Sequence, residues 1–112
     1  MTEVVIISAK RTPIGRFQGA LSGVNAPKLG ATAIASAVAT ASIAPEEIEQ
    51  VIMGNVLQAG IGQAPARQAA IFSGLPKSAG AITLHKVCGS GLRAVMDASN
   101  GIRAGEWEAV VA

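Results

Sequence analysis

The chain has 112 residues, a single cysteine, a single histidine and a formal net charge of +2. This length suits one domain and is too short for two, and one cysteine excludes an internal disulfide or a Cys-x-x-Cys metal site. With one histidine as well, a zinc site within the chain is nearly excluded, so no metal is expected. The basic residues are scattered and no aromatic residues lie between them, so nucleic acid is not an expected partner.

No apolar run reaches the ~18 residues that a membrane span needs, so no membrane partner is expected. Residues 1–7 contain neither the basic start of a secretory signal nor an Arg- and Ser-rich transit helix, and they lead directly into an apolar run. These features predict a soluble protein of a reducing compartment, the cytoplasm.

Hydrophobic periodicity predicts strands and helices in regular alternation. A β-branched run at 4–9 predicts a buried strand, and apolar residues three and four apart after Pro27 predict a helix. The predicted elements in chain order are a strand at 4–9, a helix at 27–41, a short helical start at Pro45, a strand at 51–57, a helix at 65–72, a strand at 81–87, a helix from Ser90 to about Arg103 and a strand from Val110.

This order of elements, with 13 glycines and a core rich in Ala, Val and Ile, predicts an α/β protein built as a three-layer α/β/α sandwich. The last predicted strand opens at Val110 and the sequence stops at Ala112, which leaves a sheet edge and a helix face uncovered. We therefore expect 1–112 to be an incomplete domain, truncated after the start of its fourth strand.

The only cysteine lies at the junction between a predicted strand and a predicted helix. Cys88 is followed by Gly89 and Gly91, which leave room for a ligand or a second backbone to approach. A thiol at the start of a helix lies near free backbone N–H groups and the positive end of the helix dipole, which favour the thiolate. The pattern predicts Cys88 as a nucleophile. The alternative is a small buried hydrophobic residue.

The run Gly89–Ala94 also matches the Gly-x-Gly-x-x-Ala fingerprint of dinucleotide-binding folds. Two features argue against that interpretation. His85 and Lys86 are unsuited to the fully buried first strand of such a fold. The acidic residue that binds the ribose is expected about 20 residues further on, where the sequence ends.

Two other features of the chain have structural interpretations. The run Gly60–Ala70 lacks the Lys-Ser/Thr pair of a phosphate-binding loop, so we interpret it as a glycine loop leading into a helix, with Arg67 and Gln68 solvated or bound to loop carbonyls. His85 lies three residues before Cys88, and this odd spacing places the two side chains on opposite faces of a strand. We expect a structural or interface histidine rather than a base for the thiol.

Five runs of the chain, in order, resemble the amino-terminal part of a thiolase of the acetyl-CoA C-acetyltransferase type. They are Val5–Gly15, Lys28–Gly30, Gly54–Leu57, Gly62–Ala69 and Lys86–Ala94. The resemblance covers essentially all 112 residues, and several motifs in matching order and spacing are more specific than any one of them. It implies a thiolase-like α/β/α sandwich with a mixed five-stranded sheet, of which 1–112 holds the first four strands of the N-terminal domain.

The resemblance also implies a reaction. Cys88 would accept an acyl group from acetyl-CoA, with its backbone N–H contributing to an oxyanion hole. A second acetyl-CoA would then attack the acyl-enzyme in a Claisen condensation that yields acetoacetyl-CoA, or the reverse thiolysis would occur. Coenzyme A enters as a thioester substrate, no permanently bound cofactor is implied, and no residue of this chain is assigned to binding it.

The family's catalytic histidine and second cysteine lie beyond the resembling part, so we expect the 112-residue fragment to be inactive alone. Thiolases are dimers or tetramers, which implies a homodimer or homotetramer at full length, with His85 and Lys86 near an interface. Two alternatives stay open. One is a ketoacyl synthase-like condensing enzyme, which is not expected to carry the run Gly62–Gln68, and the other is a non-catalytic fragment that needs a complementary chain.

Overall fold

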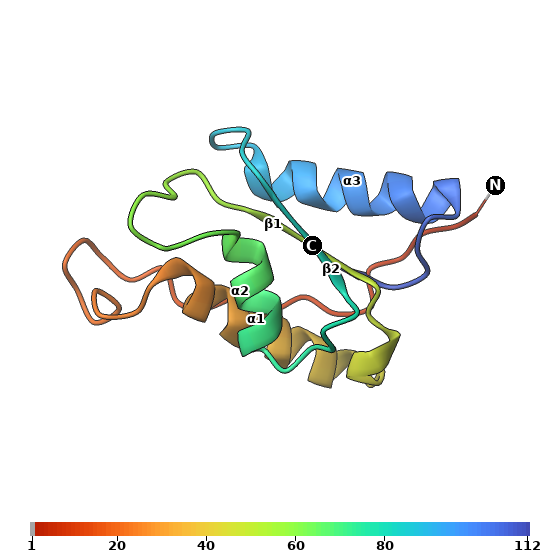
Figure 1. Cartoon of the computed structure of the whole chain (residues 1–112), viewed down its shortest axis with the longest axis horizontal. Coiled ribbons are helices and arrows are strands. Elements are labelled where there is room, and N and C mark those ends of the chain that lie inside the picture. Colours follow the sequence, from red (N-terminus) through yellow and green to blue (C-terminus); the bar gives the residue numbers. More distant parts are fainter. Residues whose placement is uncertain (1) are drawn as a thin grey trace.

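A computed structural model describes residues 2–112, and its framework is a small parallel sheet with helices on both faces (Figure 1). The elements in chain order are α1 (Ala26–Ala41), the 3-10 helix η1 (Pro45–Glu47), β1 (Gln50–Gly54), α2 (Pro65–Phe72), β2 (Gly80–Leu84), α3 (Ser90–Ala104) and β3 (Val110–Val111). The three predicted α-helices are confirmed to within one or two residues at each end. The predicted α/β class is confirmed as well.

The sheet has the strand order β2-β1-β3, and both pairs of neighbours are parallel. In the register, Ile52 of β1 lies beside Ile82 of β2, and Val51 lies beside Val111 of β3. β1 is therefore the central strand, and β2 lies at an edge. The mixed sheet implied by the resemblance is not formed among residues 2–112, since every pairing there is parallel.

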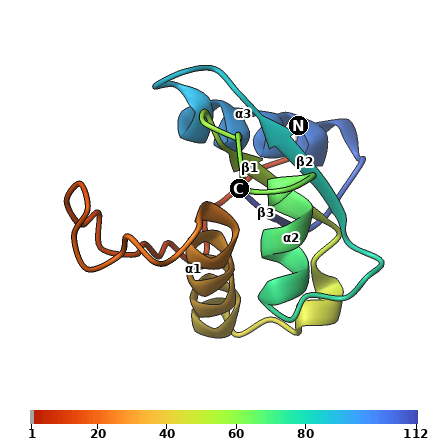
Figure 2. The same ribbon diagram turned by 60° about the vertical axis from the view of Figure 1, so that its left-hand side comes forward.

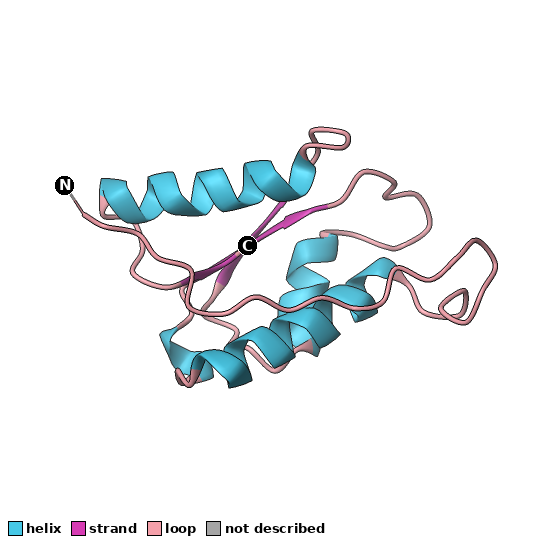
Figure 3. Ribbon diagram, turned by 180° about the vertical axis from the view of Figure 1, so that it is seen from behind, coloured by secondary structure: helices cyan, strands magenta, loops and turns pink. Residues whose placement is uncertain are grey.

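The two faces of β1 build two apolar cores, because successive side chains of a strand point to opposite faces. Val51 is fully buried and packs with the apolar residues of α1 and α2, among them Ile34 and Ala69. Ile52 packs on the other face with Ala94 and Ala98 of α3. Figure 3 shows the resulting layers, with α3 on one side of the sheet and α1 and α2 on the other.

The predicted strand at 4–9 is wrong. This segment is extended, but it makes no backbone hydrogen bond within residues 2–112, and Val5, Ile6 and Ile7 are all more than half exposed. The physical reason is that a β-branched run becomes a strand only by pairing, and within residues 2–112 this segment pairs with neither β2 nor β3, the two outer strands of the sheet. Figure 2 shows the segment that follows it, before α1, projecting away from the sheet and helices.

The strands β1 and β2 are each shorter than predicted, and both lose residues at their carboxyl ends. β1 ends at Gly54 rather than at Leu57, and β2 ends at Leu84 rather than at Val87. The residues released from the two strands form the loop after β1 and the turn before α3. The carboxyl ends of two parallel neighbours thus lie together at the start of α3.

Replacing Ile52 by Ala should lower the free energy of unfolding by about 2–5 kcal/mol, because the side chain is 1% exposed between the sheet and α3. Ile6→Ala is the matched control. Its side chain is 76% exposed, so a change below about 0.5 kcal/mol is expected. Urea unfolding followed by the fluorescence of Trp107, the single tryptophan, measures both. An equal loss in the free energy of unfolding for the two variants would contradict the unpaired state of residues 4–9.

Candidate active site at the Cys88 turn

The candidate site is the turn that joins β2 to α3. The chain leaves β2 after Leu84 and enters α3 at Ser90, so the turn spans His85 to Gly89. Val87 in this turn has a φ of +45°, in the left-handed region that a β-branched residue rarely adopts. Such a backbone conformation costs roughly 1–3 kcal/mol and persists only where neighbouring contacts impose it.

Hydrogen bonds from both the backbone and Ser90 impose that conformation. The Gly89 N–H donates to the Lys86 carbonyl at 2.9 Å, and the Ser90 N–H donates to the Val87 carbonyl at 3.2 Å. The Ser90 Oγ accepts from the Lys86 N–H at 2.9 Å and donates to the Val87 carbonyl at 2.6 Å. Ser90 is itself buried, whereas Lys86 and Val87 are exposed, so these bonds are partly shielded from water.

The end of β1 packs directly on the first residue of α3. A Cβ placed on Gly54 would lie 2.6 Å from the Ser90 Cβ and 2.8 Å from the Ser90 carbonyl carbon, a separation that real side chains do not tolerate. The next residue, Asn55, donates its backbone N–H to the Leu84 carbonyl at 3.0 Å. The end of β1 can lie against the start of α3 because Gly54 has no side chain.

Cys88 lies on the surface of this turn. Its thiol is free and exposed, so the alternative of a buried hydrophobic cysteine is wrong. Within residues 2–112 no acceptor is found for the backbone N–H groups of Cys88, Gly91 and Leu92, and α3 has no side-chain cap at this end. The predicted position of the cysteine at a helix start is thus confirmed, with unpaired amides beside it.

Two surface hollows lie along α1, one beside Val38 and Leu75 and the other beside Lys28 and Phe72. At the second hollow the Lys28 ammonium lies 3.6 Å from the centre of the Phe72 ring. Neither hollow is lined by a residue of the Cys88 turn.

His85 belongs to the turn but does not contact the thiol through a hydrogen bond. Its Nδ1 accepts from the Val87 N–H at 3.0 Å, and its ring is exposed. This bond fits the structural role predicted for the residue. The imidazole of His85 therefore contacts the strained residue Val87, and it makes no hydrogen bond to Cys88.

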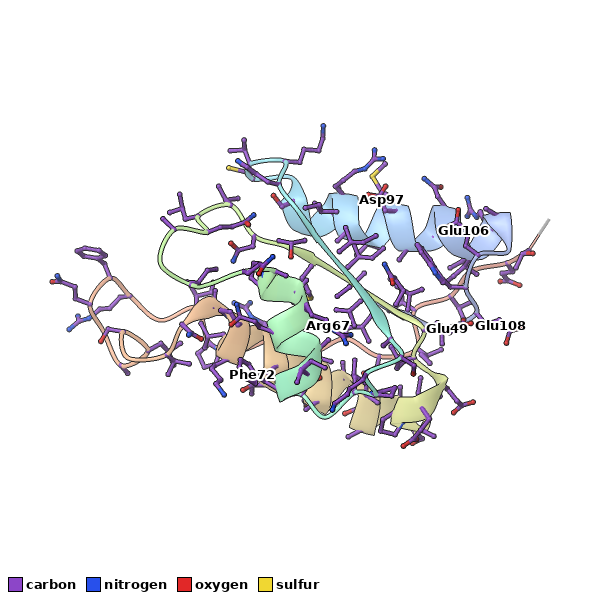
Figure 4. The ribbon with its side chains drawn as sticks, viewed as in Figure 1. Glu49, Arg67, Phe72, Asp97, Glu106 and Glu108 are labelled. Carbon is purple, nitrogen blue, oxygen red and sulfur yellow. The ribbon has the colours of Figure 1, made fainter. Side chains whose placement is uncertain are left out.

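Arg67 and Gln68 hold loop carbonyls, as the structural interpretation of the run Gly60–Ala70 predicts. The Arg67 guanidinium donates to the Ala79 carbonyl at 2.6 Å and to the Lys77 carbonyl at 2.9 Å. The Gln68 amide donates to two carbonyls of the glycine loop, at 2.8 and 2.9 Å. Figure 4 shows Arg67 on α2, well away from α3 and its labelled Asp97.

Sequence reasoning missed three residues of the site. Gly54 and Asn55 were predicted only as members of a strand and of a run that resembles the family, and Ser90 only as the start of a helix. The Asn55 Oδ1 is buried with no hydrogen-bond partner in residues 2–112. A glycine inside a predicted strand was the one available signal, since it often marks a close approach of another backbone.

Residues 2–112 contain no group of three or more His, Cys, Asp or Glu side chains arranged to hold a metal ion. None of the helices there combines the length and the apolar character that crossing a bilayer requires.

The fold and the turn define an α/β protein that displays a cysteine between a parallel strand and the helix that follows it. The family described as thiolase, N-terminal domain, matches residues 4–112, so the chain belongs to the thiolase family. This membership favours a thiolase motif over a dinucleotide-binding fingerprint as the interpretation of Gly89–Ala94. It also favours a thiolase over a ketoacyl synthase as the class of the protein.

Relatives match over the whole of this chain. It is 57% identical to an acetyl-CoA acetyltransferase of Cupriavidus necator, 53% identical to a mitochondrial acetyl-CoA acetyltransferase of Danio rerio and 51% identical to one of Homo sapiens. All 112 residues are aligned in each case, and they cover 28%, 27% and 26% of the respective relatives. The chain therefore spans about a quarter of the length of these proteins.

Arg67→Ala should lower the free energy of unfolding by about 1–3 kcal/mol, because it removes two charge-assisted bonds that tie α2 to the segment before β2. Arg103→Ala is the matched control, since Arg103 is exposed and no side-chain hydrogen bond is found for it in residues 2–112. Its expected change is below about 0.5 kcal/mol. Thermal unfolding by circular dichroism compares the two variants. An Arg67 variant as stable as the control would contradict this role.

Proposed function

We propose that this chain carries the acyl-accepting nucleophile of a thiolase of the acetyl-CoA C-acetyltransferase type, and that the nucleophile is Cys88. The observation that supports it most directly is the exposed thiol in a braced turn, beside backbone N–H groups that have no acceptor in residues 2–112. The identity of 51–57%, over all 112 residues of this chain, to the matching part of proteins named acetyl-CoA acetyltransferase supports the substrate, an acyl-CoA.

The first half-reaction is an acyl transfer to sulfur. The Cys88 thiolate attacks the carbonyl carbon of acetyl-CoA, a new C–S bond forms, and the bond between that carbon and the coenzyme A sulfur breaks. Coenzyme A leaves as a thiolate and takes up the proton that Cys88 lost. The negative charge that develops on the carbonyl oxygen is stabilised by backbone N–H donors, for which the Cys88 amide is the candidate.

The second half-reaction forms a carbon–carbon bond. A second acetyl-CoA loses a proton from its methyl carbon, and the resulting carbanion attacks the acyl carbon on Cys88. The product is acetoacetyl-CoA, and the sulfur of Cys88 is released. Thiolysis runs the same steps backwards. The base for this proton lies outside the chain in this proposal, since the single histidine, His85, is bound to the Val87 N–H.

The proposed partner besides the substrate is a second copy of the full-length protein. β2 lies at a sheet edge, and the turn that follows it carries Cys88. An edge strand pairs readily with another strand, and a twofold arrangement would bring two such edges together. A homodimer or homotetramer is therefore proposed. The cytoplasmic location stays a prediction, since two of the relatives are named mitochondrial.

The direct test uses a chimera in which this chain replaces the matching 28% of the Cupriavidus necator relative. The chimera should catalyse thiolysis of acetoacetyl-CoA, and Cys88→Ser should reduce kcat by at least about 1,000-fold, because the hydroxyl of serine is a far weaker nucleophile than a thiolate. Ser73→Cys in the background of Cys88→Ser controls for a thiol placed elsewhere. Turnover by Cys88→Ser within about tenfold of the chimera would overturn the proposal.

The 112-residue chain alone should show no thiolysis above the uncatalysed rate. It supplies the proposed nucleophile and one proposed oxyanion donor, but no base for the carbon acid. The measurement is loss of the acetoacetyl-CoA enolate absorbance with free coenzyme A, with the chimera as the positive control. Turnover by the short chain at a rate comparable to that of the chimera would contradict the assignment of the base to another part of the protein.

A further inference from the structure

We infer that Ser90 is a positioning residue for Cys88, and that its hydroxyl group aims the Cys88 backbone N–H. This inference rests on the proposed function of Cys88 as the acyl acceptor. It concerns a side chain that touches neither the sulfur nor, in this proposal, the substrate. Ser90 acts through two peptide groups of the turn, the one between His85 and Lys86 and the one between Val87 and Cys88.

The Ser90 hydroxyl group binds both of these peptide groups. It accepts a hydrogen bond from the Lys86 N–H at 2.9 Å, and it donates to the Val87 carbonyl at 2.6 Å. The same carbonyl also accepts from the Ser90 N–H at 3.2 Å. A single side chain at the start of α3 therefore closes the turn across Cys88, and the Val87 carbonyl is held by two donors.

Holding the Val87 carbonyl fixes the direction of the Cys88 N–H. The Val87 carbonyl and the Cys88 N–H belong to one planar peptide group, and in a trans peptide they point in opposite directions. The described chain contains no cis peptide bond. Because the carbonyl points at Ser90, the Cys88 N–H points away from the helix start. In residues 2–112 this amide has no acceptor of its own.

The backbone of Val87 would not hold this direction unaided. Its φ of +45° is strained for a β-branched residue, so relaxation of Val87 would rotate the peptide group that it shares with Cys88. The bonds from Ser90 oppose that rotation. His85 adds a third contact on the other side of Val87, where Nδ1 accepts the Val87 N–H.

Gly54 locks Ser90 in place from the sheet. The Ser90 side chain is 5% exposed and lies against Gly54, where an added Cβ would approach the Ser90 Cβ to 2.6 Å. Any side chain at position 54 would push the first residue of α3 away from the sheet. Gly54→Ala therefore keeps the Ser90 hydroxyl group but moves it relative to the turn.

The test compares two reactions of the same sulfur in the chimera. Attack on acetyl-CoA places negative charge on a carbonyl oxygen and needs the aimed N–H, whereas alkylation by iodoacetamide displaces iodide and needs no oxyanion donor. Ser90→Ala should slow the burst of coenzyme A release about 10- to 100-fold. The rate of alkylation of Cys88 should change by less than about threefold. Gly54→Ala should give the same pattern.

Ser73→Ala is the matched control. The Ser73 Oγ donates to the Ala70 carbonyl at 2.7 Å, which is the same three-residue spacing at the end of α2. It should leave both rates unchanged. Equal slowing of acylation and alkylation, or no slowing of either, would overturn the inference. If circular dichroism shows that Ser90→Ala does not fold, the inference is tested with Gly54→Ala, by the same comparison of the acylation rate with the alkylation rate.

The outcome separates this inference from the proposed function. If Cys88→Ser retains turnover in the chimera, the proposed nucleophile is wrong, whatever Ser90 does. If Cys88→Ser loses turnover and Ser90→Ala acylates as fast as the chimera, the nucleophile stands and the positioning role of Ser90 is wrong.

Discussion

The contact between Gly54 and Ser90 is the constraint on which the rest of the site depends. It joins the carboxyl end of the central strand to the first residue of α3, at a separation that only a residue without a side chain allows. From this fixed point the Ser90 hydroxyl group reaches back to Lys86 and Val87. The turn that carries Cys88 is therefore braced by the sheet rather than by its own sequence.

The two apolar cores explain why that fixed point is rigid. β1 is covered on both faces, with Val51 packed toward α1 and α2 and Ile52 packed toward α3. α3 is attached to β1 by Ala94 and Ala98, whose small side chains let helix and strand lie close together. A displacement of the helix start would have to open this packing. The strain in Val87 is maintained because relaxing it would cost buried contacts elsewhere.

The helices and the position of the cysteine could be predicted from the sequence, because both depend on local signals. Apolar spacing predicted α1, Pro27 marked its start, and Cys88 stood between a strand-like and a helical run. For α3 the apolar spacing predicted a helix but not its buried face, because Leu92 and Met96 are exposed and the small Ala94 and Ala98 are buried instead. The strand at 4–9 could not be judged in this way, because a strand depends on a partner that periodicity does not identify. Ser90 was missed for a similar reason, since its role lies in hydrogen bonds to a turn whose shape depends on Gly54.

Peptide mass spectrometry shows whether the sulfur of Cys88 carries the acyl group. The chimera is incubated with acetyl-CoA alone, quenched in acid and digested, since a thioester survives acid. We expect a gain of one acetyl group on the peptide that contains Cys88, and we expect this group to disappear when coenzyme A is added before the quench. An acetyl group found stably on another residue, with Cys88 unmodified, would show that Cys88 is not the acyl acceptor.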